Sequence, residues 1–343
     1  MKTKIFSLCA LAAAVGLTSC NQNRGTGNGD GSLDILLSSA LNVSTKGPAT
    51  KAPVTTSAWT YIAGWEVADA GGSVYNPDYS QPTTWISGGR VQVRTDASVT
   101  YPIALTPVQQ YNADNTTRTY IKGWYPSGNA FDSVDVAEGT ASLTTNGVVT
   151  FAAQDAPDGT VDVLYANAIY GEADDKIIDN DRPLVFNHMT TQVNFTVVGT
   201  DGLNPAAELT ALTLSGARGP ISLSLVDDSV TWNTNEQEFE LLDADPVVVP
   251  HADSSAAVVG FPLMIRPEAN NTQLKVTASV DLDGAAGPDP AVEYSDLLLT
   301  TASGRFDAGT AYTIRLRVSE NGIRLEGYIV PWNDGGTTDL DLF

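Results

Sequence analysis

Short apolar runs alternate with polar residues along most of the chain, and this pattern predicts β-strands. The runs are rich in Val, Ile, Thr, Tyr and Trp, and Gly, Asn, Asp and Pro separate them. We expect strands over residues 59–67, 90–93, 119–125, 148–152, 161–165, 192–198, 209–214, 221–225, 256–263 and 273–280. No long amphipathic helix lies between them in the pattern. The sequence therefore favours an all-β protein made of antiparallel β-sandwiches.

The strictest alternation lies close to the last residues. Apolar and polar side chains alternate through Tyr312, Thr313, Ile314, Arg315, Leu316, Arg317 and Val318. Asn321-Gly322 follows, and apolar side chains recur over 323–329, so we expect a tight hairpin with one buried face. Arg315 and Arg317 could bind an anion, but a solvent-facing strand is the simpler interpretation.

Residues 33–43 show a similar alternation. The residues on one face are Leu33, Ile35, Leu37, Leu41 and Val43, and only Ser39 interrupts them. A helix would also fit, but we favour a strand because most of the chain is strand-like. Residues 44–53 contain two prolines and the basic residues Lys46 and Lys51. We expect this linker to be exposed, extended and accessible to proteases.

The first residues have the layout of a secretory signal. Lys2 and Lys4 precede an apolar run over 5–17 that is too short to span a bilayer. Leu17-Thr18-Ser19-Cys20 follows, and it resembles the lipobox of bacterial lipoproteins. The resemblance implies that residues 1–19 are removed and that Cys20 is lipidated; an ordinary signal peptide is the alternative. The glycine-rich residues 20–32 then predict a flexible tether.

Composition limits the classes of partner. The 343 residues include 40 acidic and 18 basic side chains, for a formal net charge of −22. So acidic a chain repels nucleic acids and anionic lipid headgroups. The length suggests two domains, and the acidic stretch 171–181 has few apolar residues. We therefore expect one sandwich over 33–180 and a second over 181–343.

The sequence contains no recognisable active site. The two histidines, His188 and His251, do not belong to a metal or catalytic motif. No serine lies in a Gly-x-Ser-x-Gly motif. Two aspartate clusters, within 174–181 and 281–289, lack the spacing of a calcium loop and are interpreted as solvated turns. We predict no catalytic residue, no metal and no cofactor; a pair of glycosidase carboxylates is the least favoured alternative.

Several stretches, in their order along the chain, resemble the fimbrillin family of Bacteroidetes. They accompany the lipobox cysteine, the first strand and the basic linker. These stretches are Gly123-Trp124-Tyr125-Pro126, Asp162-Val163-Leu164-Tyr165-Ala166, Phe186-Asn187-His188-Met189, Gly309-Thr310-Ala311-Tyr312-Thr313-Ile314 and Val330-Pro331-Trp332. The resemblance implies two tandem transthyretin-like Greek-key sandwiches in a fimbrial subunit that is exported as an outer-membrane lipoprotein.

The resemblance also implies a mechanism of assembly. In that family an arginine-specific protease is understood to remove the first strand, and a strand of the next subunit fills the groove. Here the removable strand would be 33–43, but the linker contains no arginine, so Lys46 and Lys51 are the candidate processing sites. The strand donor would be the tail 337–343, through Leu340, Leu342 and Phe343; a final edge strand of the second sandwich is an equal alternative.

The predicted function follows from these implications. We expect a subunit of surface fimbriae that contributes to adhesion, with other fimbrial subunits, a processing protease and, through the lipid, the outer membrane as partners. The alternative is a surface lipoprotein that does not polymerise and binds glycan or peptide.

Overall fold

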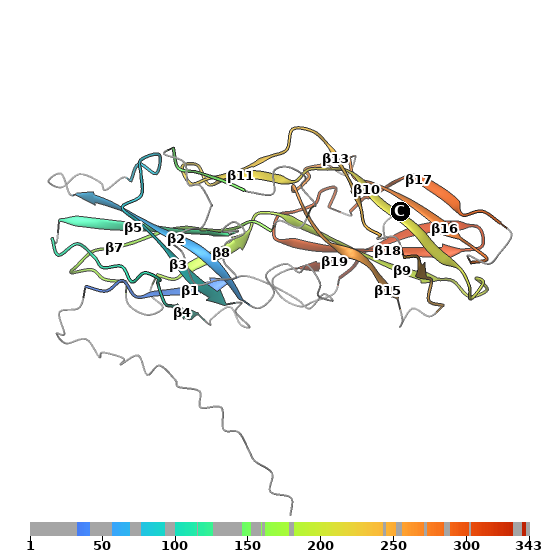
Figure 1. Cartoon of the computed structure of the whole chain (residues 1–343), viewed down its shortest axis with the longest axis horizontal. Coiled ribbons are helices and arrows are strands. Elements are labelled where there is room, and N and C mark those ends of the chain that lie inside the picture. Colours follow the sequence, from blue (N-terminus) through green and yellow to red (C-terminus); the bar gives the residue numbers. More distant parts are fainter. Residues whose placement is uncertain are drawn as a thin grey trace, which may run out of the picture. The chain divides into compact units, whose positions relative to one another are not determined.

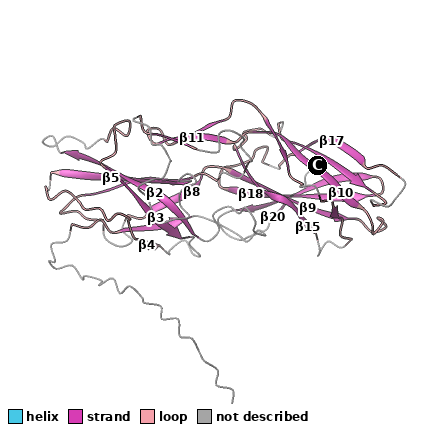
Figure 2. Ribbon diagram, viewed as in Figure 1, coloured by secondary structure: helices cyan, strands magenta, loops and turns pink. Residues whose placement is uncertain are grey.

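The computed structural model describes fifteen parts of the chain. They are residues 33–41, 57–68, 77–92, 100–114, 116–125, 146–151, 159, 162–177, 182–242, 245–251, 256–270, 273–284, 289–301, 303–331 and 338–340. Strands and loops make up these parts, and none of these residues is helical (Figure 2). The all-β class with β-sandwiches is therefore confirmed.

A seven-stranded sheet forms the first half of the fold (Figure 1). Its strands, in spatial order, are β3 (Trp85–Gln92), β2 (Ser57–Ala68), β5 (Thr117–Tyr125), β7 (Leu164–Gly171), β8 (Leu184–His188), β1 (Leu37–Leu41) and β4 (Tyr101–Ile103). The N–H groups of Gly88 in β3 and Thr106 after β4 each donate to the other residue's carbonyl, at 2.8 and 2.9 Å. The two ends of the sheet therefore meet, and the sheet curls around an interior.

The two faces of this sheet contribute to different cores, because successive side chains of a strand point to opposite faces. Along β5, Ile121 packs into the interior with residues of β1, β4 and β8. Trp124 packs on the other face with Tyr61 of β2 and Tyr165 of β7. Each face of β5 thus contributes apolar side chains to a core.

A smaller sheet covers the second of these cores. It consists of β6 (Val148–Thr150), β11 (Pro220–Ser224) and β12 (Ser229–Trp232) in the order β12-β11-β6. β11 pairs antiparallel with β6, with Ser222 opposite Thr150. Leu223 and Leu225 complete the core that contains Trp124. A hairpin from the second half of the sequence therefore completes the sandwich formed by the first half.

Two further sheets enclose the largest core. One contains β13 (Gln237–Glu240), β10 (Glu208–Ala217), β16 (Lys275–Asp281) and β17 (Val292–Leu298) in this order, with β14 (Val247–Val248) also paired to β10. The other contains β15 (Ala257–Ile265), β9 (Thr191–Gly199), β18 (Thr310–Ser319), β19 (Gly322–Pro331) and β20 (Thr338–Leu340) in this order. Their facing side chains form one continuous apolar cluster.

The predicted terminal hairpin is present as β18 and β19. Ile314 and Leu316 are buried, whereas Arg315 between them is half-buried. The turn differs by one position from the prediction. Ser319 pairs with Gly322, so Glu320 and Asn321 form the two-residue loop and Gly322 begins the return strand. Gly322 has φ +147°, a conformation that is costly for a residue with a Cβ atom.

Strand pairing near residue 180 bears on the expected domain boundary, which remains a prediction. β8 follows residue 180 in sequence and pairs antiparallel with β7 and parallel with β1. The next strand, β9, pairs with β15 and β18 of the other sandwich. The chain thus passes from the first sheet to the second sandwich between His188 and Thr191.

Candidate functional site

β1 lies inside the seven-stranded sheet, with a hydrogen-bonded strand on each side. Leu37 pairs with Ile103 of β4, and Ser39 pairs with Tyr101. On the other side Ser39 is opposite Leu184 of β8, in a parallel ladder. We call the space that β1 fills between β8 and β4 the β1 slot. A strand in this slot satisfies backbone donors and acceptors of two neighbours at once.

The residues before β1 extend its pairing along the chain. The N–H of Ile35 donates to the carbonyl of Gln109 at 2.8 Å, and the N–H of Tyr111 donates to the carbonyl of Leu33 at 2.8 Å. Asp34 forms a bridge with Gln110, whose side-chain amide donates to the Asp34 carboxylate at 2.8 Å. The predicted strand 33–43 is therefore paired from residue 33 through residue 41.

The inward face of this segment is apolar at two successive positions. Ile35 and Leu37 are buried in the core that also contains Ile103, Leu184 and Phe186. The backbone of Leu41 pairs with that of Phe186. Burial of Ile35 and Leu37 gives the segment a hydrophobic attachment to the sheet.

Small residues fill the middle of the slot. Ser38, Ser39 and Ala40 are 4%, 0% and 0% exposed, so the strand is enclosed on both of its faces there. The Ser39 hydroxyl is buried, and among the described residues no hydrogen-bond partner lies within reach of it. A buried hydroxyl without a partner costs free energy, about 1–3 kcal/mol. β1 is therefore held by its apolar side chains despite this serine.

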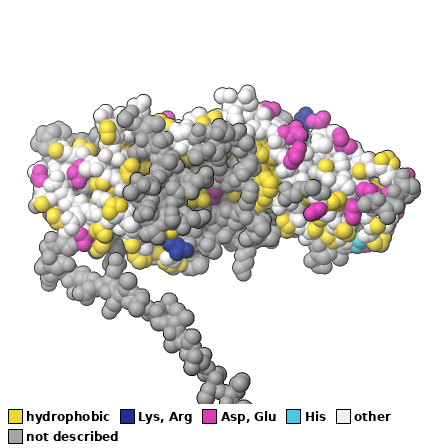
Figure 3. Space-filling model, viewed as in Figure 1, with side chains coloured by type: hydrophobic (Ala, Val, Ile, Leu, Met, Phe, Trp, Pro, Cys, Tyr) yellow, Lys and Arg dark blue, Asp and Glu magenta, His cyan; other side chains and the backbone are white. Residues whose placement is uncertain are grey.

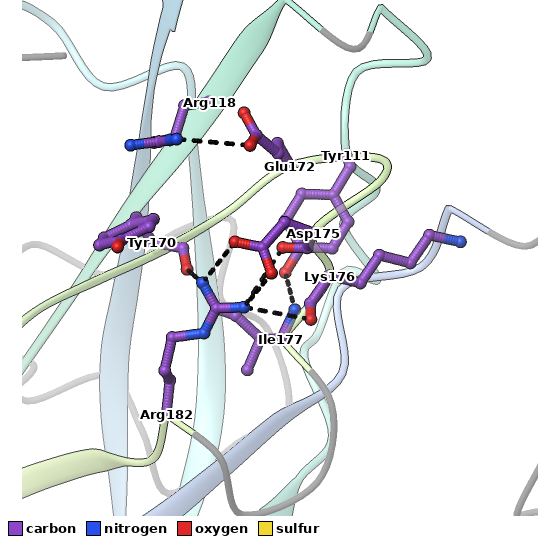
Figure 4. Close-up of polar contacts among 8 residues, drawn as sticks. All are labelled: Tyr111, Arg118, Tyr170, Glu172, Asp175, Lys176, Ile177 and Arg182. Atoms are coloured by element: carbon purple, nitrogen blue, oxygen red, sulfur yellow. Dashed lines mark hydrogen bonds and ion pairs between the residues drawn. The ribbon is translucent and has the colours of Figure 1, made fainter. Parts of the chain in front are cut away.

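A polar network lies beside the first residues of this segment (Figure 4). Tyr111, whose backbone pairs with Leu33, accepts a hydrogen bond at its hydroxyl from the N–H of Ile177 at 3.1 Å. Burial raises the pKa of Tyr111, so the hydroxyl stays protonated at neutral pH. The Tyr111 side chain thus connects the loop that follows β7 to the backbone segment that pairs with residue 33.

Arg182 fixes the same loop from the other side. Its guanidinium donates to the two carboxylate oxygens of Asp175 at 2.7 and 3.1 Å and to the Tyr170 carbonyl at 2.9 Å. The hydrogen bond from Arg182 holds the pKa of Asp175 below its ordinary value. Figure 4 shows Arg118 and Arg182 on either side of Tyr170, with guanidinium carbons 4.6 and 5.3 Å from the ring centroid.

Lys122 connects the outer face of the sheet to the β11–β12 hairpin. Its ammonium donates to the Leu225 carbonyl at 2.6 Å and to the Asp228 carboxylate at 2.7 Å, and it lies 3.7 Å from the centroid of the Tyr79 ring. The Tyr165 hydroxyl donates to the same Asp228 oxygen. Burial lowers the pKa of Lys122, although Asp228 partly opposes this. The sheet that contains β1 is thus attached on its opposite face to a hairpin from beyond residue 219.

Gly123 and the segment Phe186-Asn187-His188-Met189, which resembles the family in sequence, lie at or beside β8. Gly123 of β5 leaves room for Phe186, since a Cβ atom on Gly123 would lie 2.5 Å from the Phe186 ring. His188 ends β8 and forms a buried pair with Asp162, with 2.9 Å between Nδ1 and a carboxylate oxygen. The Thr190 hydroxyl donates to Asp162 at 2.8 Å. These groups position β8, which is one wall of the β1 slot.

The structure describes only some of the predicted site residues. It places Leu37 and Leu41 in β1 and Leu33 and Ile35 in the paired segment before it, and it places Leu340 in β20, paired with Gly327 of β19. The remaining predicted residues lie outside the described residues: Cys20, Val43, Lys46, Lys51, Leu342 and Phe343. The tail thus forms an edge strand over 338–340, one of its two predicted arrangements.

The candidate metal and anion groups have local partners. Asp175 pairs with Arg182, and Asp281 accepts hydrogen bonds from the N–H groups of Asp283 and Gly284 at 3.2 and 2.9 Å. Within the described parts of the chain, no three His, Cys, Asp or Glu side chains group as a metal site would. Arg317 forms two hydrogen bonds with Glu326, at 2.8 and 3.1 Å. The same parts contain no helix that is long and apolar enough to span a membrane.

Sequence reasoning did not identify Lys122, Asp228 or Tyr111 as important residues. Lys122 interrupts an apolar run, Tyr120 to Tyr125, and a lysine flanked by Ile121 and Gly123 was the available signal. Its partner is 106 residues away, so no local pattern could have connected the two.

The protein is all-β and consists of paired sandwiches. Its first strand, β1, lies between β8 and β4 in the curled seven-stranded sheet. A family model described as fimbrillin-like matches residues 95–332. The chain belongs to the fimbrillin-like family, and this confirms the resemblance found in the sequence. Membership of this family indicates a fimbrial, cell-surface protein.

Two solved structures have a similar fold. A candidate cell adhesion protein from Bacteroides uniformis aligns with a TM-score of 0.51 at 16% identity, over 89% of this chain and 100% of the other. A fimbrial protein from Bacteroides vulgatus aligns with a TM-score of 0.50 at 16% identity, over 86% of this chain and 99% of the other. No curated protein matches the sequence. At this identity the two structures support the fold.

Proposed function

We propose that this protein is a structural subunit of fimbriae that polymerises by strand exchange after proteolysis. In this proposal the precursor is exported as a lipoprotein anchored in the outer membrane through Cys20. A protease then cuts after Lys46 or Lys51, and the segment that contains β1 leaves. A strand of another subunit enters the β1 slot, and the fimbria contributes to adhesion at the cell surface. The proposal includes no catalytic activity.

The observation that supports this most strongly is the position of β1. A strand at the edge of a sheet could detach and leave one neighbour unpaired, but β1 has β4 on one side and β8 on the other. Its loss would expose two rows of backbone donors and acceptors and the apolar wall formed by Ile103, Leu184 and Phe186. Such a groove is a template for an incoming strand.

Proteolysis is a reasonable trigger because the chain itself keeps β1 in place. While β1 is covalently joined to β2, it competes with any free strand at a high effective concentration. A cut within residues 44–53 ends this advantage and makes the exchange bimolecular. Burial of Ile35 and Leu37 still favours β1, at roughly 1.5–3 kcal/mol for each side chain. Exchange then depends on whether the new strand binds better.

The experiment is limited digestion of the purified precursor with a protease that cuts after lysine, followed by SDS gels of unboiled samples. We expect cleavage near Lys46 or Lys51, loss of the N-terminal segment and a ladder of SDS-resistant multimers. A trimmed monomer that never forms multimers would contradict the proposal.

A matched pair of variants identifies the residue after which cleavage is needed for multimers to form. Lys46→Gln combined with Lys51→Gln should abolish the ladder, because no lysine or arginine would remain in the linker. Arg24→Gln should leave it intact, because a cut at residue 24 would free the lipid without freeing β1. A ladder that persists in the double lysine variant would place the essential cut elsewhere.

A further inference from the structure

We propose that the β1 slot selects a strand in which two large apolar residues, spaced two apart, are followed by three small residues. By this rule the slot rejects the C-terminal tail of this same chain, residues 337–343, and accepts a strand of a different subunit. This inference rests on the proposed release of β1, and it assigns the class of partner that replaces it.

The first part of the rule comes from the inward positions at the start of the segment. Ile35 and Leu37 are both buried in the interior core, whereas Leu36 between them is mostly exposed. A strand that replaces β1 must therefore bring large apolar side chains to positions 35 and 37. Position 36 accepts any residue that tolerates solvent.

The second part comes from positions 38–40, where neither face of the strand has free space. Ser38, Ser39 and Ala40 are 4%, 0% and 0% exposed. The cross-strand neighbours of Ser39 are the larger Tyr101 and Leu184, which occupy the volume around its short side chain. Protein interiors are close-packed, so a longer side chain there forces its neighbours to move and weakens the binding of the strand.

Charge makes these positions more selective. An ionised carboxylate that is buried without a cation loses its hydration and gains no compensating partner. Ser38 and Ala40 lie on the face opposite Ile35 and Leu37 and are 4% and 0% exposed, so a carboxylate at either position would be removed from water. An aspartate at position 38 or 40 would therefore be rejected far more strongly than a large apolar residue.

The tail of this chain fails the rule in each register. Its sequence is Thr337-Thr338-Asp339-Leu340-Asp341-Leu342-Phe343. With Leu340 and Leu342 at positions 35 and 37, Phe343 falls at position 38. In the reversed direction Leu342 and Leu340 take the same positions, and Asp339 falls at position 38. With the leucines at positions 37 and 39, or at 39 and 41, Asp341 falls at position 38 or 40. With the leucines at positions 33 and 35, no large apolar residue reaches position 37 in either direction.

The structure gives the tail a different place. Residues 338–340 pair with β19, with Asp339 opposite Tyr328 and Leu340 opposite Gly327. This strand lies at the edge of its sheet, where one row of backbone groups remains open to solvent or to another chain. Charged residues are common on edge strands, and Asp339 belongs to this one.

The test measures strand entry directly. A recognition sequence for a site-specific protease is placed between Lys46 and Lys51, and the purified protein is cut there. Fluorescently labelled peptides are then added, and their entry is followed by anisotropy and by native gels. The peptides correspond to residues 32–43, to residues 335–343, and to residues 32–43 with Ser38→Asp or Ser39→Leu.

We expect the 32–43 peptide to enter and the 335–343 peptide to bind at least about 100-fold more weakly, because each of its registers either places Phe343 or an aspartate at position 38 or 40 or leaves position 37 without a large apolar residue. The Ser38→Asp peptide should lose affinity to a similar extent, and the Ser39→Leu peptide by about tenfold. If the tail peptide enters as well as the 32–43 peptide, the selection rule is wrong and strand exchange stands. If no peptide enters, including 32–43, the release of β1 is itself wrong and the rule falls with it.

Discussion

At the scale of single residues, the segment that contains β1 combines strong and weak points of attachment. Ile35 and Leu37 bury apolar surface, and Tyr111 joins the start of the segment to the loop after β7. Ser39 works against them, because its buried hydroxyl has no partner among the described residues. The unpaired hydroxyl reduces the free energy with which β1 is held, and this is compatible with the proposed release of the strand.

Ser39→Ala should therefore stabilise the uncut protein. The change removes a buried hydroxyl and leaves a methyl group in nearly the same volume, so we expect a gain of about 1 kcal/mol in the free energy of unfolding. Urea denaturation followed by tryptophan fluorescence measures it. A loss of stability would mean that the hydroxyl is hydrogen-bonded after all. The same substitution should slow the formation of multimers after cleavage.

The Asp175–Arg182 pair should give a small pH dependence. The pKa of Asp175 is below its ordinary value of 3.8 in the folded protein, so the pair stabilises the fold at pH above that value. The contribution disappears as the pH falls through the lower, folded pKa. Because the pair is largely exposed, we expect a modest effect.

Arg182→Gln isolates this effect. The difference in unfolding free energy between wild type and the variant should shrink as the pH is lowered from 6 towards 2, in unfolding curves measured at about one-unit steps. Asp175→Asn should behave like Arg182→Gln. A difference that stays constant over this range would show that Arg182 acts through its hydrogen bond to the Tyr170 carbonyl and not through Asp175.

At the scale of strands, neighbouring elements define the β1 slot. β8 is one wall, and it is held in place by Phe186 against Gly123 and by His188 paired with Asp162. β4 is the other wall, and it closes the sheet onto β3 through the residues that follow it. The strands β8, β5, β4 and β3 together define the slot. For this reason β1 has a specific position in the sheet although it contains only five residues.

Gly123→Ala should weaken this wall. The new methyl group would lie 2.5 Å from the Phe186 ring, which must shift and disturb the pairing of Phe186 with Leu41. We expect a loss of about 2 kcal/mol in the free energy of unfolding. Adding Phe186→Leu supplies space for the methyl group, so the double variant should lose less than the sum of the two single variants. Strict additivity would show that the two residues do not interact.

Much of this architecture could be predicted from local pattern. The β18–β19 hairpin and the strand within 33–43 followed from alternation, because a sheet with one buried face imposes a period of two. The turn of the hairpin was misplaced by one residue, since Asn321-Gly322 and Glu320-Asn321 both precede the same apolar alternation. Patterns of this kind record which residues face a core, and not which strands are neighbours.

The pairing of distant strands could not be predicted. Nothing in residues 220–232 indicates that they pair with β6 and cover the first sheet, because such pairing depends on contacts over more than 70 residues of sequence. Lys122 illustrates the same limit. In sequence it is a single charged residue within an apolar run, and only the distant hairpin shows that it is buried beside Tyr79 and Asp228.

At the scale of the molecule, the two halves of the chain are joined at the face opposite β1. Residues 220–232 leave the second sandwich to complete the first one, and Lys122 is bonded to their turn. The proposed release of β1 would open the interior of the first sheet on one face and leave this connection on the other face in place. The acidic surface, which Figure 3 shows over β10 and β17, keeps such a subunit soluble.

Lys122→Met should test how much this connection contributes. The substitution keeps the apolar length and removes the bonds to Leu225 and Asp228. Because Asp228 is 43% exposed and can be hydrated, we expect a loss of about 2 kcal/mol in unfolding free energy rather than the full cost of a buried ion pair.

The matched control is Lys275→Met, which removes a pair of similar length at the surface. Lys275 and Asp296 are 2.9 Å apart, and their side chains are 44% and 71% exposed. We expect a loss below about 0.5 kcal/mol for this variant. Equal losses in the two variants would show that burial of Lys122 adds nothing to the connection.

The central claim is that the working subunit has lost β1, and N-terminal sequencing of the protein from fimbriae detached from cells tests it most directly. We predict a first residue immediately after Lys46 or Lys51, with neither Cys20 nor residues 33–43 present. A subunit that begins at a lipidated Cys20 in assembled fimbriae would contradict the account, because β1 would still fill its slot.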